Sequence, residues 1–393
     1  MRLRSQVYLK CTLLFFFLIS TLNLLPTAAA QSPAKSKDKP QPWMNASLSP
    51  DDRASMVVKE MTLDEKISML HGTGMAGLSP LSPLIIHSNR GAGYVPGIPR
   101  LGIPAIQESD AAYGVRASGE NGRYSTALPS CIGGAATWDL EGAYQYGSLI
   151  GSELRAQGFN MGLGGGVNLT REPRNGRTFE YMGEDPILAG KMVASVIKGI
   201  QSEHVIGDIK HYALNDQESG RNAVNITIDE RAARESDLLA FEIGTKESDV
   251  GAVMCSYNRL DGVYACENKF LLNDVLRKDW NYKGFVVSDW GAAHSTVKSS
   301  HAGLDQEQPG WIFYGDDLKR AVLAGTVSHA ELDEHVRRTL RSMFAAGLFV
   351  RHEGAVGHHV HHQRRILICV SGGLSLGRRH VDPRHDRRRR WGT

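Results

Sequence analysis

Hydrophobic and polar positions in the middle of the chain follow two alternating periods. Short apolar runs end in polar or charged residues, and segments with a helical period separate most of them. The apolar runs predict strands within 103–110, 158–172, 205–216, 251–258, 284–290 and 301–308. The amphipathic segments predict helices at 139–157, 186–203, 229–246, 269–280, 315–323 and 329–344. Before them, Ser49 and a capping box from Thr62 to Glu65 predict two helices that end near His71.

Strands that alternate with helices indicate parallel pairing, as in a (β/α) barrel or an open doubly wound sheet. An open sheet gathers its ligand groups at one switch point. Here most predicted strands end in reactive side chains, namely Asp110, Arg171, Lys210, Tyr257 and Asp289. That distribution is typical of the C-terminal rim of a barrel. We therefore predict an α/β fold of the TIM-like (β/α)8 type, in a regular or an irregular and incomplete form.

The N-terminal end differs from the middle in composition. A basic start, an apolar stretch over 11–25 and three alanines before Gln31 predict a signal peptide over 1–30, cleaved near Ala30. A membrane anchor is the alternative, but the apolar run is short for a span. A polar, proline-containing linker is expected at 31–43. The sequence thus predicts a secreted or periplasmic protein without a stable membrane partner.

The C-terminal end differs even more. Residues 351–393 hold ten Arg, no Lys and seven of the chain's 15 His. We interpret this segment as a disordered tail translated out of frame from a GC-rich gene. The alternative is a basic tail for nucleic acid or anionic lipid, with "HHVHH" (358–362) as a metal-binding tract. Residues 31–350 hold more acidic than basic side chains, so we expect no nucleic-acid partner.

The cysteines and the N-x-S/T sequons say little about the function of the chain. Cys255 and Cys266 flank a turn-rich stretch and can form a local disulfide in an oxidising compartment. Asn45, Asn168 and Asn225 lie in N-x-S/T sequons, a pattern too common to decide anything.

The absence of several motifs argues against nucleotide, serine-hydrolase and metal chemistry. The sequence has no P-loop, no G-x-S-x-G elbow and no CxxC pair, and "GLGGGV" (162–167) lacks the helix start and trailing acid of a dinucleotide site. We therefore expect no metal and no cofactor. Carboxylates, cations and aromatic rings at strand ends are the composition of a sugar site, because charged groups bind vicinal hydroxyls bidentately. A buried carboxylate there can attack an anomeric carbon.

Five segments resemble glycoside hydrolase family 3, the β-glucosidase-like family. "GFVVSDWGA" (284–292) resembles its nucleophile segment, and the resemblance extends in order over about residues 44–349. The other four segments are "ESDAAYGVR" (108–116), "REPRNGRTFEYMGEDP" (171–186), "KHYALNDQESGR" (210–221) and "VMCSYNRLDG" (253–262). The combination is specific, whereas a single Ser-Asp-Trp match would be weak.

The resemblance implies a role for nine residues. Asp289 would be the nucleophile that forms a covalent glycosyl-enzyme, with Tyr257 close to it and Trp290 in the sugar-stacking wall. The sugar hydroxyls in the −1 subsite would be held by Asp110, Arg116, Arg177, Lys210, His211 and Arg221. Structural roles are the alternatives: a helix cap for Asp289, surface ion pairs for the arginines at 116 and 221, and a core position for His211.

Acidic residues near these segments are expected to have supporting roles. Glu180 and Glu184 suit partners of arginines, and Asp305 and Glu307 are weaker candidates for the rim. The chain has Asp110-Ala111-Ala112 where many members have Asp-Gly-Pro, which leaves the shape of that loop open.

The resemblance also narrows the reaction. "ALNDQESGR" (213–221) replaces the Gly-His loop of relatives that act on N-acetylglucosamine, which favours the glucosidase-like branch. We expect a retaining β-glucosidase-like exo-glycosidase that acts on a β-linked oligosaccharide or glycoside. A β-xylosidase or other β-glycosidase is the alternative, and a secreted, non-catalytic sugar-binding protein is the alternative of another class. The oligomeric state stays open.

A retaining glycosidase also needs a second carboxyl group, which acts as general acid and base. In the glucosidase-like branch this glutamate comes from a second domain, an α/β sandwich that follows the barrel. The segment 331–349 resembles the helix that ends the barrel, and the Arg/His tail follows it directly. We therefore expect a barrel over 44–350 in a truncated chain that lacks its acid/base domain.

Overall fold

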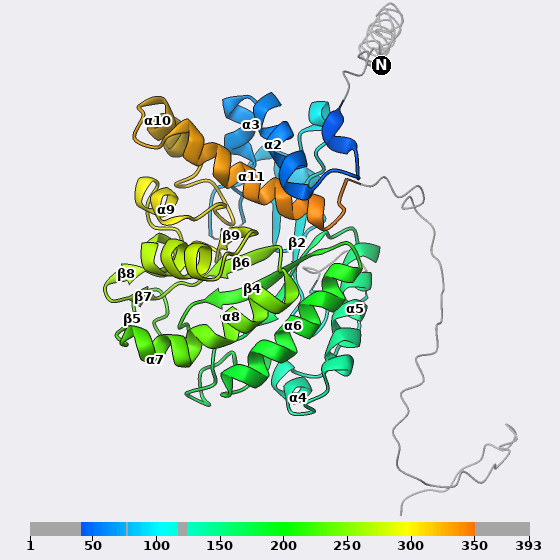
Figure 1. Ribbon diagram of the computed structural model, residues 1–393, viewed down its shortest axis with the longest axis vertical. Helices are drawn as coiled ribbons and strands as arrows, with labels where there is room; N and C mark the ends of the chain where they lie inside the picture. The colour runs from blue at the N-terminus through cyan, green and yellow to red at the C-terminus, as the bar shows by residue number, and fades with distance from the viewer. Residues whose placement is uncertain (1–40, 76–77, 117–123, 350–393) are drawn as a thin grey trace, which may run out of the picture. The chain divides into compact units, whose positions relative to one another are not determined.

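The computed structural model describes residues 41–75, 78–116 and 124–349 (Figure 1). The predicted signal peptide, most of the predicted linker and the predicted tail lie outside the described residues. The main sheet has the order β1-β2-β3-β4-β6-β9. Its strands are β1 (Gly93–Val95), β2 (Ile106–Asp110), β3 (Met161–Gly166), β4 (Ile206–Tyr212), β6 (Ala252–Cys255) and β9 (Phe285–Ser288). All neighbours pair in parallel except β1, which is antiparallel to β2.

The six-stranded sheet is curled, and short bridges link its last strand to its first. Gln306 pairs in parallel with Val287 of β9, and Glu307 pairs in parallel with His71. Thr73 N then donates to Tyr94 O of β1 at 3.1 Å. The α/β barrel-like fold is thereby confirmed in an irregular form. Its seam consists of the three-residue strand β1 and two bridging segments, one at His71 and one at Gln306 and Glu307. The strand predicted within 301–308 is present only as this short bridge, whereas the segments at 71 and 93–95 are too short to show a strand period in the sequence.

Helices cover the outside of the sheet. Figure 1 shows α5 (Leu140–Ala156), α6 (Pro186–Ser202) and α8 (Asp237–Ser248) side by side, and α11 (His329–Ala345) beside α2 (Pro50–Glu60). The shorter helices are α3 (Leu63–Ser68), α4 (Cys131–Ala135), α7 (Glu230–Glu235), α9 (Val297–Ala302), α10 (Asp316–Leu323) and a π-helix at Phe270–Asp279. A second, three-stranded sheet contains β5 (Asn225–Ile226), β7 (Arg259–Leu260) and β8 (Val263–Tyr264).

The predicted helix at 229–246 is divided in the structure. Ser236 leaves the helical region, with φ −128° and ψ −96°, between α7 and α8. Its hydroxyl donates to Ala232 O and accepts from the Arg171 guanidinium. Arg171 also pairs with Asp237 at the start of α8. A side chain from the β3–α6 connection therefore binds at the break, which the periodicity of 229–246 does not reveal.

The packed part of the chain begins slightly earlier than expected. Trp43, placed at the end of the predicted linker, is buried in the core, and its indole N–H donates to Leu101 O at 3.1 Å. The linker therefore ends before Pro42, where a short 3-10 helix starts. The capping box from Thr62 to Glu65 is confirmed, although α3 ends at Ser68, because the following residues turn into the seam of the sheet.

The Cys255–Cys266 disulfide is also confirmed, with Cα atoms 5.2 Å apart. Within the described ranges, no group of three or more His, Cys, Asp or Glu side chains is arranged to hold a metal ion. No helix in the same ranges is long and apolar enough to cross a membrane.

Candidate active site

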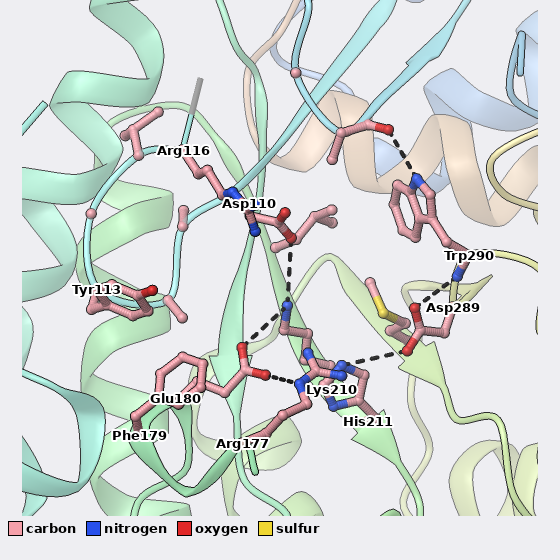
Figure 2. Close-up of a pocket in the computed structure, with 18 of the residues that line it drawn as sticks. Asp110, Tyr113, Arg116, Arg177, Phe179, Glu180, Lys210, His211, Asp289 and Trp290 are labelled. Carbon is pink, nitrogen blue, oxygen red and sulfur yellow. Dashed lines mark hydrogen bonds and ion pairs between the residues drawn. The ribbon is translucent and has the colours of Figure 1, made fainter. Parts of the chain in front are cut away.

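A cavity of about 910 Å³ opens where the strands of the main sheet end (Figure 2). Asp110 comes from the end of β2, Lys210 and His211 from β4, and Asp289 directly follows β9. The carboxyl ends of parallel strands lie on one side of a sheet, which brings these side chains together. The lining includes all nine site residues predicted from the sequence: Asp110, Arg116, Arg177, Lys210, His211, Arg221, Tyr257, Asp289 and Trp290.

Asp289 is buried on the wall of this cavity. The Trp290 backbone N–H donates to Asp289 Oδ1 at 2.7 Å, and Asp289 Oδ2 lies 3.5 Å from His211 Nε2. Burial raises the pKa of Asp289, while the Arg177 and Lys210 cations oppose that rise. The next helix, α9, starts only at Val297, so Asp289 does not cap it.

Lys210 lies between two carboxylates. Its Nζ is 3.9 Å from both Asp110 Oδ1 and Glu180 Oε2, and Glu180 also pairs with the Arg177 guanidinium (Figure 2). Glu180 is thus a partner of an arginine, as expected, and Glu184 is exposed. Each of the two further carboxyls in the cavity lining, Asp110 and Glu180, faces the Lys210 ammonium.

His211 is held from both sides of its ring and by its backbone. Asn168 donates to His211 O at 3.0 Å and accepts from His211 N at 2.8 Å, and the Tyr181 hydroxyl lies 3.2 Å from His211 Nδ1. Burial, with help from Arg177 and Lys210, lowers the pKa of His211 well below its ordinary value. The imidazole is therefore neutral and can donate from Nε2 toward Asp289.

Asn168 and Tyr181 were missed by the sequence reasoning. Asn168 lies in a sequon, yet it is 2% exposed, and its amide nitrogen and oxygen both hydrogen-bond the His211 backbone. The folded chain cannot present it for glycosylation. Its only sequence signal is its place two residues after the end of β3, among the strand ends that form the cavity.

Aromatic and cationic groups form the wall near Asp289. The Arg221 guanidinium lies 4.1 Å above the Tyr257 ring, and the Tyr257 hydroxyl donates to Trp290 O at 3.1 Å. The Trp290 indole N–H donates to Ala92 O at 2.9 Å, which fixes the ring against the start of β1. Arg221 is therefore part of the cavity and not an isolated surface ion pair.

The loop after β2 lines the opposite side. The Arg116 backbone N–H donates to Asp110 O at 2.9 Å, closing a tight loop, and Ala112 is buried beneath it. The Ala112 carbonyl accepts from the Tyr146 hydroxyl at 3.1 Å, which shows how the Asp-Ala-Ala variant of this loop is held. At the mouth, the rings of Tyr113 and Phe179 meet edge to face, with centroids 5.5 Å apart.

The two weaker acidic candidates do not line the cavity. Asp305 is fully buried and pairs with Arg277 at 2.6 Å and Arg338 at 3.0 Å. Glu307 accepts backbone N–H groups from residues 312–314. Both residues are structural, because their carboxylates are saturated by partners away from the cavity.

Glu218 is a further residue that the sequence reasoning missed. It accepts from Arg221 Nη1 at 2.7 Å and from Asn215 Nδ2 at 3.2 Å, and it lies 3.6 Å from Arg177 Nη1. It therefore joins the two predicted sugar-holding arginines. Its place between Lys210 and Arg221 in one motif was the available signal.

Replacing Glu218 with glutamine is expected to weaken binding of a monosaccharide, the ligand class that the sequence resemblance implies, about tenfold, or about 1.4 kcal/mol. The neutral amide no longer holds both guanidinium groups by charge, so they lose their orientation. Titration calorimetry measures the effect. Glu172→Gln is the matched control, since Glu172 pairs with Arg174 on the surface, away from the cavity lining. Equal affinities for the two variants would contradict this role of Glu218.

Comparison with known proteins identifies the family. A sequence model of the glycosyl hydrolase family 3 N terminal domain matches residues 95–342. The chain belongs to glycoside hydrolase family 3. It is 37% identical over 299 residues to the thermostable beta-glucosidase B of Acetivibrio thermocellus, covering 74% of this chain and 37% of that protein. It is 38% identical over 327 residues to beta-glucosidase B of Emericella nidulans, covering 81% of this chain and 37% of that protein.

Solved structures agree with this assignment. Beta-glucosidase 3B from Thermotoga neapolitana, solved in complex with glucose, matches with a TM-score of 0.71 and 37% identity, over 75% of this chain and 43% of that one. A beta-glucosidase from Streptomyces venezuelae, solved with D-glucose, matches with a TM-score of 0.69 and 36% identity, over 76% and 38%. The family 3 chain described here thus spans less than half the length of these relatives and corresponds to their N-terminal domain.

Proposed function

We propose that this chain supplies the nucleophile and the −1 subsite of a retaining β-glucosidase-like glycosidase. The observation that carries the proposal is the position of Asp289, a buried carboxylate at a strand end, surrounded by hydroxyl-binding groups and the Trp290 ring. Retaining glycosidases need one such carboxylate to attack the anomeric carbon. The two relatives solved with glucose support a glucose unit as the sugar.

The proposed first step can be followed atom by atom. An Asp289 oxygen forms a bond to the anomeric carbon while the bond from that carbon to the leaving oxygen breaks. Positive charge develops on the sugar ring, and the Asp289 carboxylate balances it. Lys210 with Asp110 would bind vicinal hydroxyls, because a cation and a carboxylate 3.9 Å apart offer a donor and an acceptor side by side.

The leaving oxygen must also receive a proton. Among the described residues, the other carboxyls in the cavity lining are Asp110 and Glu180, and both are ion-paired with Lys210. Apart from Asp289, the described lining therefore holds no carboxyl without a cation beside it to serve as the proton donor. Loss of general acid catalysis typically slows a reaction by about 10²–10⁴-fold. Substrates whose leaving group needs no proton are therefore the appropriate probes.

A trapping experiment tests the function. A dinitrophenyl 2-deoxy-2-fluoro-β-glucoside reacts without acid catalysis and leaves a slowly hydrolysed glycosyl-enzyme. We expect one fluoroglucosyl group per chain, located on Asp289 by peptide mass spectrometry. The matching xyloside tests the β-xylosidase alternative. Glucose binding without any adduct would favour the non-catalytic sugar-binding alternative, and turnover of cellobiose would reveal a proton donor that the described residues do not provide.

The trapping rate is expected to fall on the acid side with a midpoint above the ordinary aspartate pKa of 3.8. The sign follows from burial, which raises the pKa of Asp289, because only the ionised form attacks. Arg177→Gln removes an opposing cation and should move this midpoint further up. Arg174→Gln is the control, since Arg174 is exposed and pairs with Glu172. The proposal fails if the midpoint is the same in the wild type and in Arg177→Gln.

We also retain secretion as a proposal. The Cys255–Cys266 disulfide supports it, because such bonds persist mainly in oxidising compartments.

A further inference from the structure

Two carboxyl groups lie inside the sheet, one layer below the cavity. Side chains two residues apart on a strand point to the same face. Glu108 precedes Asp110 by two residues on β2, and Asp208 precedes Lys210 by two on β4. Both carboxyls are fully buried. This layer of a barrel is usually filled by branched apolar side chains, so each carboxyl needs a partner or a proton.

Among the described residues, the Glu108 carboxyl has one hydrogen-bond partner, Gln308. One further hydrogen atom between the two side chains would complete a pair of hydrogen bonds. Gln308 Nε2 donates to Glu108 Oε1 at 2.9 Å. The second oxygen of that carboxyl, Glu108 Oε2, and the amide oxygen of Gln308 are both buried and have no hydrogen-bond partner among the described residues. Two buried acceptors without a donor are unfavourable, because each has lost its hydrogen bond to water and gained none in return.

The two unpartnered oxygens border the same small space. A Cβ at Gly93 would lie 2.2 Å from Glu108 Oε2 and 3.2 Å from Gln308 Oε1. A Cβ at Gly72, on the neighbouring segment of the seam, would lie 2.3 Å from the same Gln308 oxygen. Only glycine at these positions leaves room for the two side chains to meet.

We propose that Glu108 is a neutral carboxylic acid in a reciprocal pair with Gln308. Its Oε2–H donates to Gln308 Oε1, while Gln308 Nε2–H donates to Glu108 Oε1. A single proton thus provides a partner for both unpartnered oxygens and leaves Glu108 itself without a charge. The pair joins β2 to the segment at 306–308 and so fastens the seam of the curled sheet from within.

The surrounding charges favour the protonated form. Burial, with the Asp208 and Asp110 carboxylates, raises the pKa of Glu108 to about 8. Burial also raises the pKa of Asp208 to about 7, although Lys210 on the same strand opposes that rise and Asp289 adds to it. The charged groups that act on Glu108 and Asp208 are therefore mostly carboxylates. Their negative charge disfavours ionisation of Glu108.

The pair also reaches the proposed nucleophile. The Gln308 backbone N–H donates to Ser288 Oγ at 2.9 Å, and the Gln308 carbonyl accepts from Gly291 N at 2.9 Å. Gln308 thus binds the chain on both sides of Asp289. Glu108 is accordingly a positioning residue for Asp289, acting through Gln308. This consequence rests on the proposed function, whereas the pairing itself does not.

The pairing predicts a pH dependence of stability. The folded state binds the Glu108 proton more tightly than the unfolded chain, whose glutamate has an ordinary pKa of 4.5. Stability should therefore fall as the pH rises from about 4.5 to about 8 and level off above that. Glu108→Gln can form the same two hydrogen bonds with an amide and has no proton to lose. Relative to wild type, its Tm should rise by several degrees across this range.

Three full-length variants test the pairing. Infrared spectra at pH 7 should show a protonated carboxyl band that weakens in Glu108→Gln. The double variant Glu108→Gln with Gln308→Glu exchanges the partners, and both the band and the pH-dependent decline in Tm should return. In Asp208→Asn, the infrared band from Glu108 and the decline in Tm that Glu108 causes should both remain. An unchanged band together with parallel Tm curves for wild type and Glu108→Gln would overturn the proposal.

Other outcomes separate the parts of the inference. A band that is absent in wild type, with Tm rising as NaCl or CaCl₂ is added, would mean that a cation occupies this layer, which overturns the pairing. The positioning role predicts that wild-type trapping slows above pH 8 and that Glu108→Gln resists this loss. Equal alkaline profiles would overturn positioning alone. If wild type is never labelled while the band and Tm results hold, the proposed function fails and the pairing stands.

Discussion

Asp289→Gly is expected to lose hydrolysis of dinitrophenyl β-glucoside by about 10⁴–10⁶-fold, the usual range for removing a nucleophile that acts with partners. Added azide should restore turnover and yield the α-glucosyl azide. The physical reason is geometric, because the proposed nucleophile would lie on the face of the sugar opposite the leaving group. A small anion can occupy the space left by its carboxylate and attack from the same side.

The dinitrophenyl substrate makes this test independent of a general acid, since its leaving group departs without a proton. Chromatography with anomer assignment identifies the product. Asp110→Gly is the matched control, because it also removes a carboxylate from the same cavity but one that is paired with Lys210. It should weaken substrate binding and show no rescue by azide. Full activity of Asp289→Gly without azide would place the nucleophile elsewhere.

Asp305→Asn is expected to reduce the free energy of unfolding by about 3–5 kcal/mol, the usual effect of breaking a buried ion pair from one side. Asp305 is fully buried, and its Oδ2 binds Arg277 at 2.6 Å and the Val286 N–H of β9 at 2.7 Å. Its Oδ1 binds Arg338 at 3.0 Å and His335 Nδ1 at 2.7 Å. The amide leaves these cations without a counter-charge.

Urea unfolding measures the loss. Asp317→Asn is the control, since Asp317 pairs with Arg320 at the surface and should contribute no more than about 1 kcal/mol. Burial alone would raise the pKa of Asp305, but Arg277 and Arg338 hold it well below its ordinary value. The stabilisation is therefore present above the ordinary aspartate pKa and is lost as the pH falls below it. Equal unfolding energies for the two variants would contradict the role assigned to Asp305.

The ion pairs of Asp305 are expected to contribute to stability but not to ligand binding. Asp305 directly follows the turn after α9 and does not line the cavity, so the folded Asp305→Asn protein should bind glucose as wild type does. Glu108→Gln is expected to behave in the opposite way at neutral pH, with a gain in stability. A buried titratable group near a site often lowers stability, because it is kept there to position functional residues and not to stabilise the fold.

Several features could be predicted from the sequence because they are local or periodic. The apolar runs located β2, β3, β4, β6 and β9, and the cap at Thr62 located the start of α3. The convergence of Asp110, Lys210 and Asp289 on one cavity followed from parallel pairing, which places all strand ends at one rim. The resemblance added expected roles to these strand-end residues, and it alone contributed Arg116, Arg177, Arg221 and Trp290.

Other features depend on the folded structure. The seam residues His71 and Tyr94 lie where the sequence indicates a loop, and the break at Ser236 depends on Arg171 from a different connection. The same holds for Glu218, Asn168 and the Glu108–Gln308 pair, whose members are up to 200 residues apart. Periodicity along the chain reports which face a side chain occupies, so it predicted strands, helices and rim positions. It carries no information on which distant polar groups meet, because those partners are selected only when packing brings them together and burial requires every donor and acceptor to be paired.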